Sequence, residues 1–316
     1  MAEAHAWVAP QLRSLARGTR AFCSWDEDSL TMAVEALRNC LARRGFGDAP
    51  VECLTFASTT APFADLQNAS LAARACGLPA TVRTQDSGGS TRAGVSALIT
   101  ALQSDAPGEA LLVAADNRKA RPGSGQEFHY GAGAAAVQVS AQEVIASYLG
   151  SHSTNSVFVD HYRTRDGDYD YYWEERWIRD EGYGRLVPDT VTPLLKATAT
   201  QAEDIRFFCV PGHLSRLGSL LARKIGIPEE AVVDSRAGDI GDTGTPQPLL
   251  MLATALEQAQ PGDRILVVGF GAGCDALLLQ ATDAVVDLPG RLRVEELDRL
   301  VGHRHLGDHE LDRLVV

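Results

Sequence analysis

The sequence predicts an α/β protein built from two halves that share one layout. Short apolar runs, typical of buried strands, alternate with longer segments whose apolar residues recur at helical spacing. The same order of elements returns after about residue 150. The chain has 316 residues, which is enough for one large domain or two similar ones. Alternation of this kind indicates a mostly parallel sheet covered by helices on both faces.

The first half, residues 1–150, opens with a helix predicted over residues 26–44. Its residues Leu30, Leu37 and Leu41 fall on one face, and acidic residues stand at its positive N-terminal end. Only about 25 residues precede this helix, and they also have a helical pattern. The other elements expected in this half are helices over 65–76 and 91–103 and strands over 51–57, 82–85, 110–115 and 134–140.

The second half, residues 151–288, repeats the plan around an unusual segment at 160–184. That segment is crowded with Tyr, Trp and charged residues and follows neither period, so it is either a lid or partner surface or an insertion packed on the body. The charged, leucine-spaced tail at 289–316 is expected to dock on the body or on a partner. The regular elements expected here are helices over 188–200, 215–225 and 246–259 and strands over 205–210, 232–233, 264–269 and 275–280.

Charge and composition exclude several classes of function. A net charge of −12 argues against nucleic acid as a partner, because binding to the phosphate backbone requires a basic surface. No apolar run approaches the length of a membrane span, and the N-terminus lacks the pattern of a signal peptide. The six cysteines form no CxxC pair, which predicts reduced thiols in a cytoplasmic protein and no metal site.

The glycine run Gly269-x-Gly271-x-Gly273 follows a predicted strand and therefore resembles a dinucleotide-binding turn. That fingerprint requires a helix next, whereas a second strand follows here, so a tight strand-to-strand turn is expected. The run from Gly131 to Gly133 also opens a strand. Small residues at such a turn allow backbone N–H groups to approach a substrate oxygen and stabilise negative charge on it.

His213 is the strongest candidate for a catalytic residue. It comes just after a strand end, where α/β folds place their ligands, and Gly212 permits a close approach of the backbone. Arg216, Arg223 and Lys224 follow on the next helix and are candidates to meet the phosphates of a ligand. The plainer alternatives are a structural histidine and solvated helix residues. The other seven histidines, with His129 and His161 among them, have no comparable context.

Three polar residues could join His213. Asp242 lies in a Gly-x-Thr-Gly turn, where it either bonds its own backbone or orients a substrate near His213. Ser90 and Thr91 stand where a Gly-Gly turn enters a helix. Capping explains Ser90 by default, yet a helix N-terminus also stabilises nucleophiles and oxyanions.

The cysteines have plainer interpretations. Cys209 lies in a strand and Cys40 on a helix, so both are expected in the core, whereas Cys274 follows the glycine turn and is a candidate to line a cavity. None opens a helix after a strand, as a nucleophile of low pKa should.

Several motifs together resemble the archaeal and bacterial 3-hydroxy-3-methylglutaryl-CoA synthase-like proteins of the thiolase-like superfamily. The resemblance implies a duplicated, five-layered α-β-α-β-α fold, usually dimeric, with a coenzyme A thioester as substrate and no tightly bound cofactor. It spans about residues 20–285. The matching stretches are 25–36, 92–98, 131–136, 241–244 and 269–275, together with His213.

The family's catalytic groups carry over only in part. By resemblance, the acyl-carrying cysteine falls at Thr91, the acidic proton donor at Thr59 and the asparagine of the polar turn at Asp242, while the histidine is retained as His213. Without a thiol, transfer through an S-acyl enzyme is not possible in the usual way. The residues expected to bind the substrate or its oxyanion are Thr59, Gly244, Gly271 and Ala272.

Three hypotheses follow from the resemblance. The first is an enzyme that makes or breaks a C–C bond in an acyl-CoA thioester without a covalent cysteine intermediate. The second is a scaffold subunit that assembles with a thiolase and a small OB-fold/zinc-ribbon protein through the segment 160–184. The third is an ordinary thiolase-type transferase that uses Cys274 or Cys76.

Overall fold

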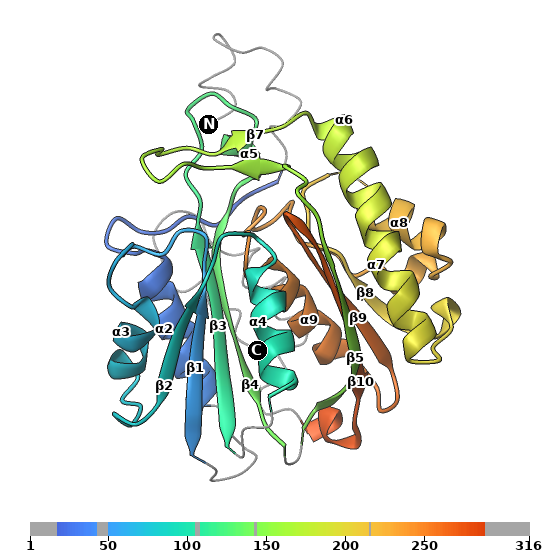
Figure 1. The fold of residues 1–316 in the computed structure, drawn as a ribbon, viewed down its shortest axis with the longest axis horizontal. Coiled ribbons are helices and arrows are strands. Elements are labelled where there is room, and N and C mark those ends of the chain that lie inside the picture. Colours follow the sequence, from blue (N-terminus) through green and yellow to red (C-terminus); the bar gives the residue numbers. More distant parts are fainter. Residues whose placement is uncertain (1–17, 43–49, 105–107, 142–143, 215, 288–316) are drawn as a thin grey trace.

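Two four-stranded sheets stand side by side in the computed structural model, which describes residues 18–42, 50–104, 108–141, 144–214 and 216–287 (Figure 1). The first sheet has the order β2-β1-β3-β4 and the second the order β5-β10-β9-β8. The strands of the first sheet are β1 (Val51–Ala57), β2 (Arg83–Ser87), β3 (Glu109–Asn117) and β4 (Ala132–Val139). Those of the second are β5 (Ala146–Asn155), β8 (Ile205–Cys209), β9 (Arg264–Phe270) and β10 (Gly273–Ala281).

Helices form three layers around the sheets, which confirms the five-layered α-β-α-β-α architecture (Figure 1). One buried apolar cluster lies under each helix layer. The outer helices are α2 (Ser29–Ala42) and α3 (Asn68–Ala75) on the first sheet and α7 (Gly184–Ala197) and α8 (Leu217–Ile225) on the second, and α4 (Ala93–Leu102) and α9 (Gln247–Gln258) lie between the sheets.

Strand β9 shows why the central strands have uninterrupted apolar sequences. Ile265 and Val267 belong to the cluster between the two sheets, whereas Leu266 and Val268 belong to the outer cluster beneath α7 and α8. Successive side chains of a strand point to opposite faces, and here both faces are covered. All four residues are therefore fully buried.

The sheets are less parallel than the sequence predicts. Strands β1, β2 and β3 run parallel, as do β8 and β9, but β4, β10 and β5 join antiparallel. The turn at Gly271 connects β9 directly to β10, as predicted, and β4 opens after Gly131, so neither glycine run precedes a helix. The predicted stub at 232–233 is a single bridge from Val232 to Phe208.

Strand β5 was not predicted. Its sequence is polar and its side chains are partly or fully exposed, because it forms the edge of the second sheet and pairs only with β10. A strand without a buried face carries little apolar signal. The predicted division between the halves at residue 150 falls inside this strand.

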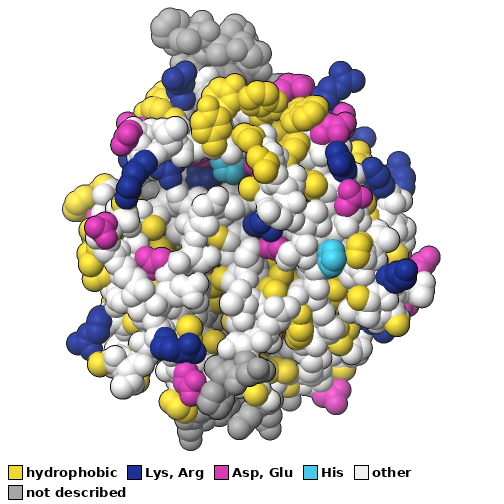
Figure 2. Space-filling model, in the orientation of Figure 1, with side chains coloured by type: hydrophobic (Ala, Val, Ile, Leu, Met, Phe, Trp, Pro, Cys, Tyr) yellow, Lys and Arg dark blue, Asp and Glu magenta, His cyan; other side chains and the backbone are white. Residues whose placement is uncertain are grey.

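The aromatic segment folds over one end of the molecule. Strands β6 (His161–Tyr162) and β7 (Tyr171–Tyr172) form a hairpin, followed by the short helix α6 (Glu175–Trp177) and a π-helical turn that leads into α7 (Figure 1). Hydrophobic side chains gather on the surface at this end (Figure 2). The tail at 289–316 lies outside the described residues, and among those described no helix has the length and apolarity needed to cross a membrane.

Candidate active site

The candidate site lies where four strands end. Strands β1, β3, β8 and β9 are followed directly by Ser58, Arg118, the loop to His213 and Gly271. Parallel strands bring their carboxyl ends to one edge of a sheet, which is the usual location of a ligand in α/β folds. The lid formed by β6, β7 and α6 covers this edge (Figure 1).

His213 reaches the site through a glycine that lets the chain pass close to a neighbour. Gly212 has φ +140°, and a Cβ there would lie 3.2 Å from the hydroxyl oxygen of Tyr183. The side chain of His213 is only 9% exposed. The residue therefore points into the protein and not into solvent.

The two ring nitrogens of His213 have different partners. Nδ1 lies 3.5 Å from Oδ2 of Asp242, and Nε2 lies 3.2 Å from the hydroxyl of Tyr172. Because an ionised carboxylate only accepts hydrogen bonds, these partners assign the proton to Nδ1. Nε2 is then free to accept from Tyr172 and to take a proton from a substrate.

Asp242 is held in its ionised form by a buried arginine. Arg118 Nη2 lies 2.7 Å from Oδ1 of Asp242 and also donates to the Asp242 carbonyl at 2.7 Å, while its guanidinium stacks on the ring of Tyr130. Burial alone would raise the pKa of Asp242, but Arg118 and then His213 outweigh it and hold that pKa well below its usual range. Asp242 also accepts the N–H of Gly244 at 2.9 Å, so it bonds the backbone of its own turn and contacts His213 as well.

Thr91 and His213 line the same small cavity, of about 40 Å³. The Thr91 hydroxyl, however, donates to the carbonyl of Phe270 at 2.8 Å and not to His213. Ser90 donates to the carbonyl of Gly271 at 2.6 Å and accepts the Arg92 N–H at 3.3 Å. Both hydroxyls thus tie the start of α4 to the β9–β10 turn, and neither is paired with a base.

A larger cavity of about 1030 Å³ adjoins the small one, and Asp160 and His161 line both. Three of the four residues predicted to bind the substrate line this larger cavity. The backbone N–H groups of two of them already donate to acceptors within the protein. The Gly271 N–H donates to the carbonyl of Gly273 at 3.1 Å, and the Thr59 N–H donates to Oδ1 of Asp116 at 2.7 Å. Its lining includes Thr59, Ser90, Gly271 and Ala272.

The fourth of these residues, Gly244, lines the small cavity, where its N–H is bound to Asp242. Binding of the substrate or its oxyanion by these residues stays a prediction, and in this structure the N–H groups of Gly244, Gly271 and Thr59 each have an acceptor within the protein.

The β9–β10 turn has little room for a side chain at Gly271. We expect Gly271→Ala to lower the free energy of unfolding by about 1–3 kcal/mol, because a Cβ there would lie 2.6 Å from both Ser90 Oγ and Thr91 Oγ1. Denaturant titration measures this loss. Gly77→Ala is the matched control, since Gly77 also has positive φ but has open space around its Cβ position. Equal losses in the two variants would show that the contact at Gly271 costs nothing.

The predicted coenzyme A cations face elsewhere. Arg223 is 82% exposed and lies 3.9 Å from Glu229, and the Nζ of Lys224 donates to the carbonyl of Gly184 at 2.5 Å. Arg216 precedes α8 in a left-handed backbone conformation, and none of the three lines either cavity. Helix α8 directs Arg223 and Lys224 away from the cavities, which the spacing from His213 did not reveal. A cation that does line the larger cavity is Arg163 of the hairpin.

Sequence reasoning missed two histidines of the site. His161 Nδ1 lies 2.8 Å from Asp160 Oδ2, and this bond and charge raise the pKa of His161 although burial opposes them. The ring of His129 stacks on that of His213 with centroids 4.5 Å apart, and burial together with His213 lowers the pKa of His129. Both rings come from short elements, the hairpin and the single-turn helix α5 (Gln126–His129), which leave no periodic signal.

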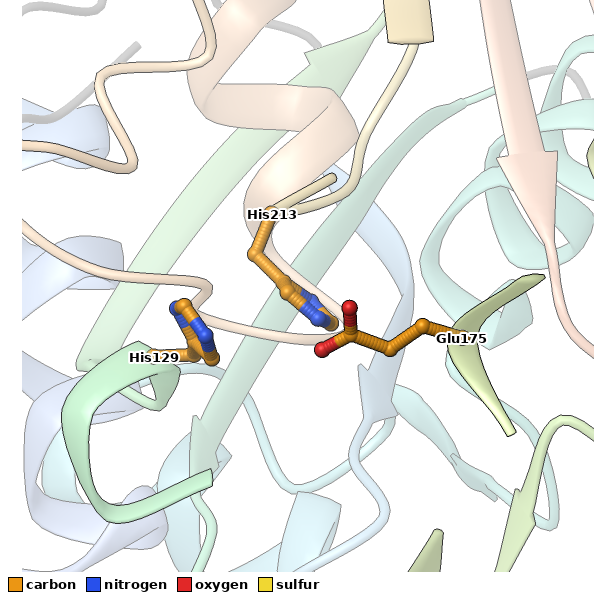
Figure 3. Close-up of side chains that lie close together, drawn as sticks. All are labelled: His129, Glu175 and His213. Carbon is orange, nitrogen blue, oxygen red and sulfur yellow. The ribbon is translucent and has the colours of Figure 1, made fainter. Parts of the chain in front are cut away.

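The lid supplies two more side chains. The hydroxyl of Tyr172 forms a hydrogen bond with Nε2 of His213. The Glu175 carboxylate points toward His129 and His213 (Figure 3). The crowding of Tyr, Trp and charged residues at 160–184 was the only sequence signal for them. Segment 160–184 therefore forms part of the site while still exposing aromatic side chains such as Trp173 and Trp177.

The two thiols of the third hypothesis, Cys274 and Cys76, lie where burial raises their pKa. Cys40 and Cys209 are buried, as predicted, and the described residues contain no disulfide. Cys274 is buried in the outer cluster beneath α7, outside the lining of both cavities, and burial raises its pKa to about 12. Burial also raises the pKa of Cys76. Neither thiol fits the third hypothesis, which needs an accessible thiolate.

The chain is similar to several known proteins. Residues 195–280, which include His213 and the β9–β10 turn, match the family model for the C-terminal part of 3-oxoacyl-[acyl-carrier-protein] synthase III. A hydroxymethylglutaryl-CoA synthase of Thermococcus gammatolerans is 31% identical over 268 residues, covering 82% of this chain and 76% of the relative. That of Aeropyrum pernix is 31% identical over 286 residues, covering 88% and 79%.

Solved structures show the same fold. The crystal structure of a hydroxymethylglutaryl-CoA synthase complexed with coenzyme A superposes with a TM-score of 0.78 at 16% identity, covering 98% of this chain and 88% of the other. Together with the sequence relatives, this agreement extends over both halves and both sheets. The chain therefore belongs to the hydroxymethylglutaryl-CoA synthase family and has the thiolase-like fold.

Proposed function

We propose that this protein acts on acyl-CoA thioesters and makes or breaks a carbon–carbon bond by proton transfer at His213, with no acyl group carried on the enzyme. The observation that carries the proposal is the Nε2 of His213, held in its basic tautomer by Asp242 and facing a cavity whose other catalytic candidate, Thr91, is bound to a carbonyl. The thioester class is supported by the family and by the coenzyme A in the related crystal structure.

The proposed reaction needs no nucleophile from the chain. His213 Nε2 removes a proton next to the thioester carbonyl, the electron pair moves onto the thioester oxygen, and Tyr172 donates its hydroxyl to that oxygen. The enolate carbon then attacks a second carbonyl, and the proton on Nε2 passes to the new alkoxide. The same steps in reverse break the bond. Asp242 stabilises the imidazolium in both directions.

Replacement of His213 tests this function. We expect His213→Ala to lower turnover of a coenzyme A thioester at least about 100-fold, because the base is removed, while binding of the thioester persists. Turnover is measured on the isolated chain, and intact-mass spectrometry follows any acyl group left on the protein. His152→Ala, an exposed histidine on β5, is the matched control. An acyl adduct on Thr91 or Ser90 during turnover would contradict the mechanism.

A second candidate function is that of a scaffold subunit in a complex with a thiolase and an OB-fold/zinc-ribbon protein. It is supported by the aromatic side chains that the lid leaves exposed, Tyr162, Tyr171, Trp173 and Trp177 (Figure 2). The same His213→Ala variant separates the two functions. Full activity of an assembled complex that contains this variant would favour the scaffold and reject acid–base chemistry at His213.

A further inference from the structure

Three side chains that are capable of binding a metal, one of them His213, converge at one point of the site. His129 comes from α5, Glu175 from α6 and His213 from the loop after β8, and their ligand atoms lie within 4.8 Å of one another (Figure 3). The proposed chemistry uses only His213. It leaves the convergence of a second imidazole and a carboxylate on the same point without a role.

The two imidazoles are fixed relative to each other through Asp242. The Asp242 side chain lies against Nδ1 of His213, and the Asp242 N–H donates to the carbonyl of His129 at 2.6 Å. Histidines that bind a metal through one nitrogen characteristically give the other N–H to a carboxylate. His213 has that arrangement: Asp242 lies against its Nδ1, which leaves Nε2 as the nitrogen available to a metal.

The separation of these atoms is close to what a zinc ion requires. Zinc binds imidazole nitrogen and carboxylate oxygen at about 2.0–2.2 Å, so two ligand atoms of a tetrahedral site lie roughly 3.4 Å apart. Metal binding therefore requires the exposed side chain of Glu175 to move inward and the His129 ring to turn out of its stack on His213. A water molecule or the Tyr172 hydroxyl, 3.2 Å from Nε2, is placed to be the fourth ligand.

We propose that His129, Glu175 and Nε2 of His213 form a binding site for a divalent transition-metal ion, with Zn²⁺ as the ion that suits it. Two imidazoles and one carboxylate favour Zn²⁺ over Mg²⁺ or Ca²⁺, which prefer oxygen ligands. Bound zinc occupies the nitrogen that the proposed reaction uses as its base. The ion therefore inhibits turnover, and this second part of the inference rests on the proposed function.

Calorimetric titration of the chelator-treated full-length protein with Zn²⁺ tests the site. All variants are built on His303→Ala/His305→Ala/His309→Ala, which removes the histidines of the tail as competing ligands. We expect one ion per chain and at least a 10-fold weaker affinity in both His129→Ala and Glu175→Gln. His152→Ala is the control and keeps the affinity, and Mg²⁺ gives no binding.

Co²⁺ reports the ligands independently of activity. We expect the visible absorption of tetrahedral Co²⁺ in the parent and its loss in His129→Ala and Glu175→Gln, without a thiolate-to-cobalt band in the near ultraviolet. Unchanged Zn²⁺ affinity in both variants, or such a thiolate band, would overturn the metal site.

Turnover assays then separate this inference from the proposed function. Zinc that binds as described and inhibits supports both, whereas zinc that binds without inhibiting leaves the site intact and rejects His213 as the base. Absence of binding together with an inactive His213→Ala rejects the metal site alone.

Discussion

Replacing Asp116 by alanine is expected to lower the free energy of unfolding by at least about 3 kcal/mol. Asp116 is fully buried at the end of β3, where Oδ1 accepts the N–H groups of Thr59 and Thr60 at 2.7 and 3.0 Å. Its Oδ2 accepts the N–H of Thr245 at 2.9 Å. Alanine would leave the N–H groups of Thr59 and Thr245 without this acceptor and the N–H of Thr60 with Ser58 Oγ alone. Each unsatisfied buried group costs about 1 kcal/mol or more, and the hydroxyls bound to the same carboxylate add to the loss.

Loss of the Asp116 carboxylate would remove hydrogen bonds to both halves of the molecule. Ser58 and Thr60 also donate their hydroxyls to Oδ1, and Thr245 donates its hydroxyl to Oδ2, so one carboxylate joins the loop after β1 to the loop before α9. Urea or guanidinium titration measures the change. Asp239→Ala, which removes a half-exposed partner of Arg236, is the control and should stay within about 0.5 kcal/mol of the parent. A loss below 1 kcal/mol in Asp116→Ala would mean that water replaces the carboxylate.

Asp242→Asn is expected to destabilise the protein by about 3–5 kcal/mol and to impair turnover. The side chain of Arg118 is only 5% exposed, and Asp242→Asn removes the carboxylate with which this buried cation forms its ion pair, leaving Asp116 and Asp170 as the other nearby negative charges. An amide that replaces the carboxylate also fails to hold the His213 proton on Nδ1, so the base is no longer prepared. Both effects arise from one substitution because Asp242 lies between Arg118 and His213.

The ion pair between Arg118 and Asp242 should also affect how the free energy of unfolding depends on pH. The pKa of Asp242 is lower in the folded state than in the unfolded chain, so its contribution is present above about pH 4 and is lost as pH falls through the folded-state value. Below pH 4 the parent should therefore lose more stability than Asp242→Asn. Arg118→Met is the companion variant, and the double variant should be more stable than the sum of the two single losses predicts. Strict additivity would show that the pair is not coupled.

Local patterns predicted most of the layers correctly. The helical spacing of Leu30, Leu37 and Leu41 anticipated α2, and the apolar runs at 51–57 and 264–269 anticipated strands that are buried on two faces. The continued strand pattern after Gly273 distinguished a hairpin from a dinucleotide-binding turn. The polar edge strand β5 was not predicted because it has no apolar face. The antiparallel pairing of β5, β10 and β4 was not predicted because the direction of a strand depends on its partner in the sheet.

His213 and Asp242 could be singled out from the sequence because each stands beside a glycine in a loop, Gly212 and Gly241, where turn chemistry leaves a signal. Tyr172, Glu175, His129 and Arg118 left none, since each lies on a short or irregular segment and gains its role only from residues distant in the chain. Arg223 and Lys224 had the right charge and spacing, but the turn of α8 directs them away from the cavities.

The amino-acid order by itself therefore determined the layers, the family and the imidazole at the end of β8, because periodicity and turn chemistry act over a few residues. The tertiary structure alone decided that the hydroxyls of Ser90 and Thr91 donate to backbone carbonyls. It also decided that Arg118 forms an ion pair with Asp242, and that His129 and Glu175 converge on His213. These are contacts between residues 38 to 181 positions apart in the chain. Their geometry depends on how two sheets and a lid pack together, which no local pattern encodes.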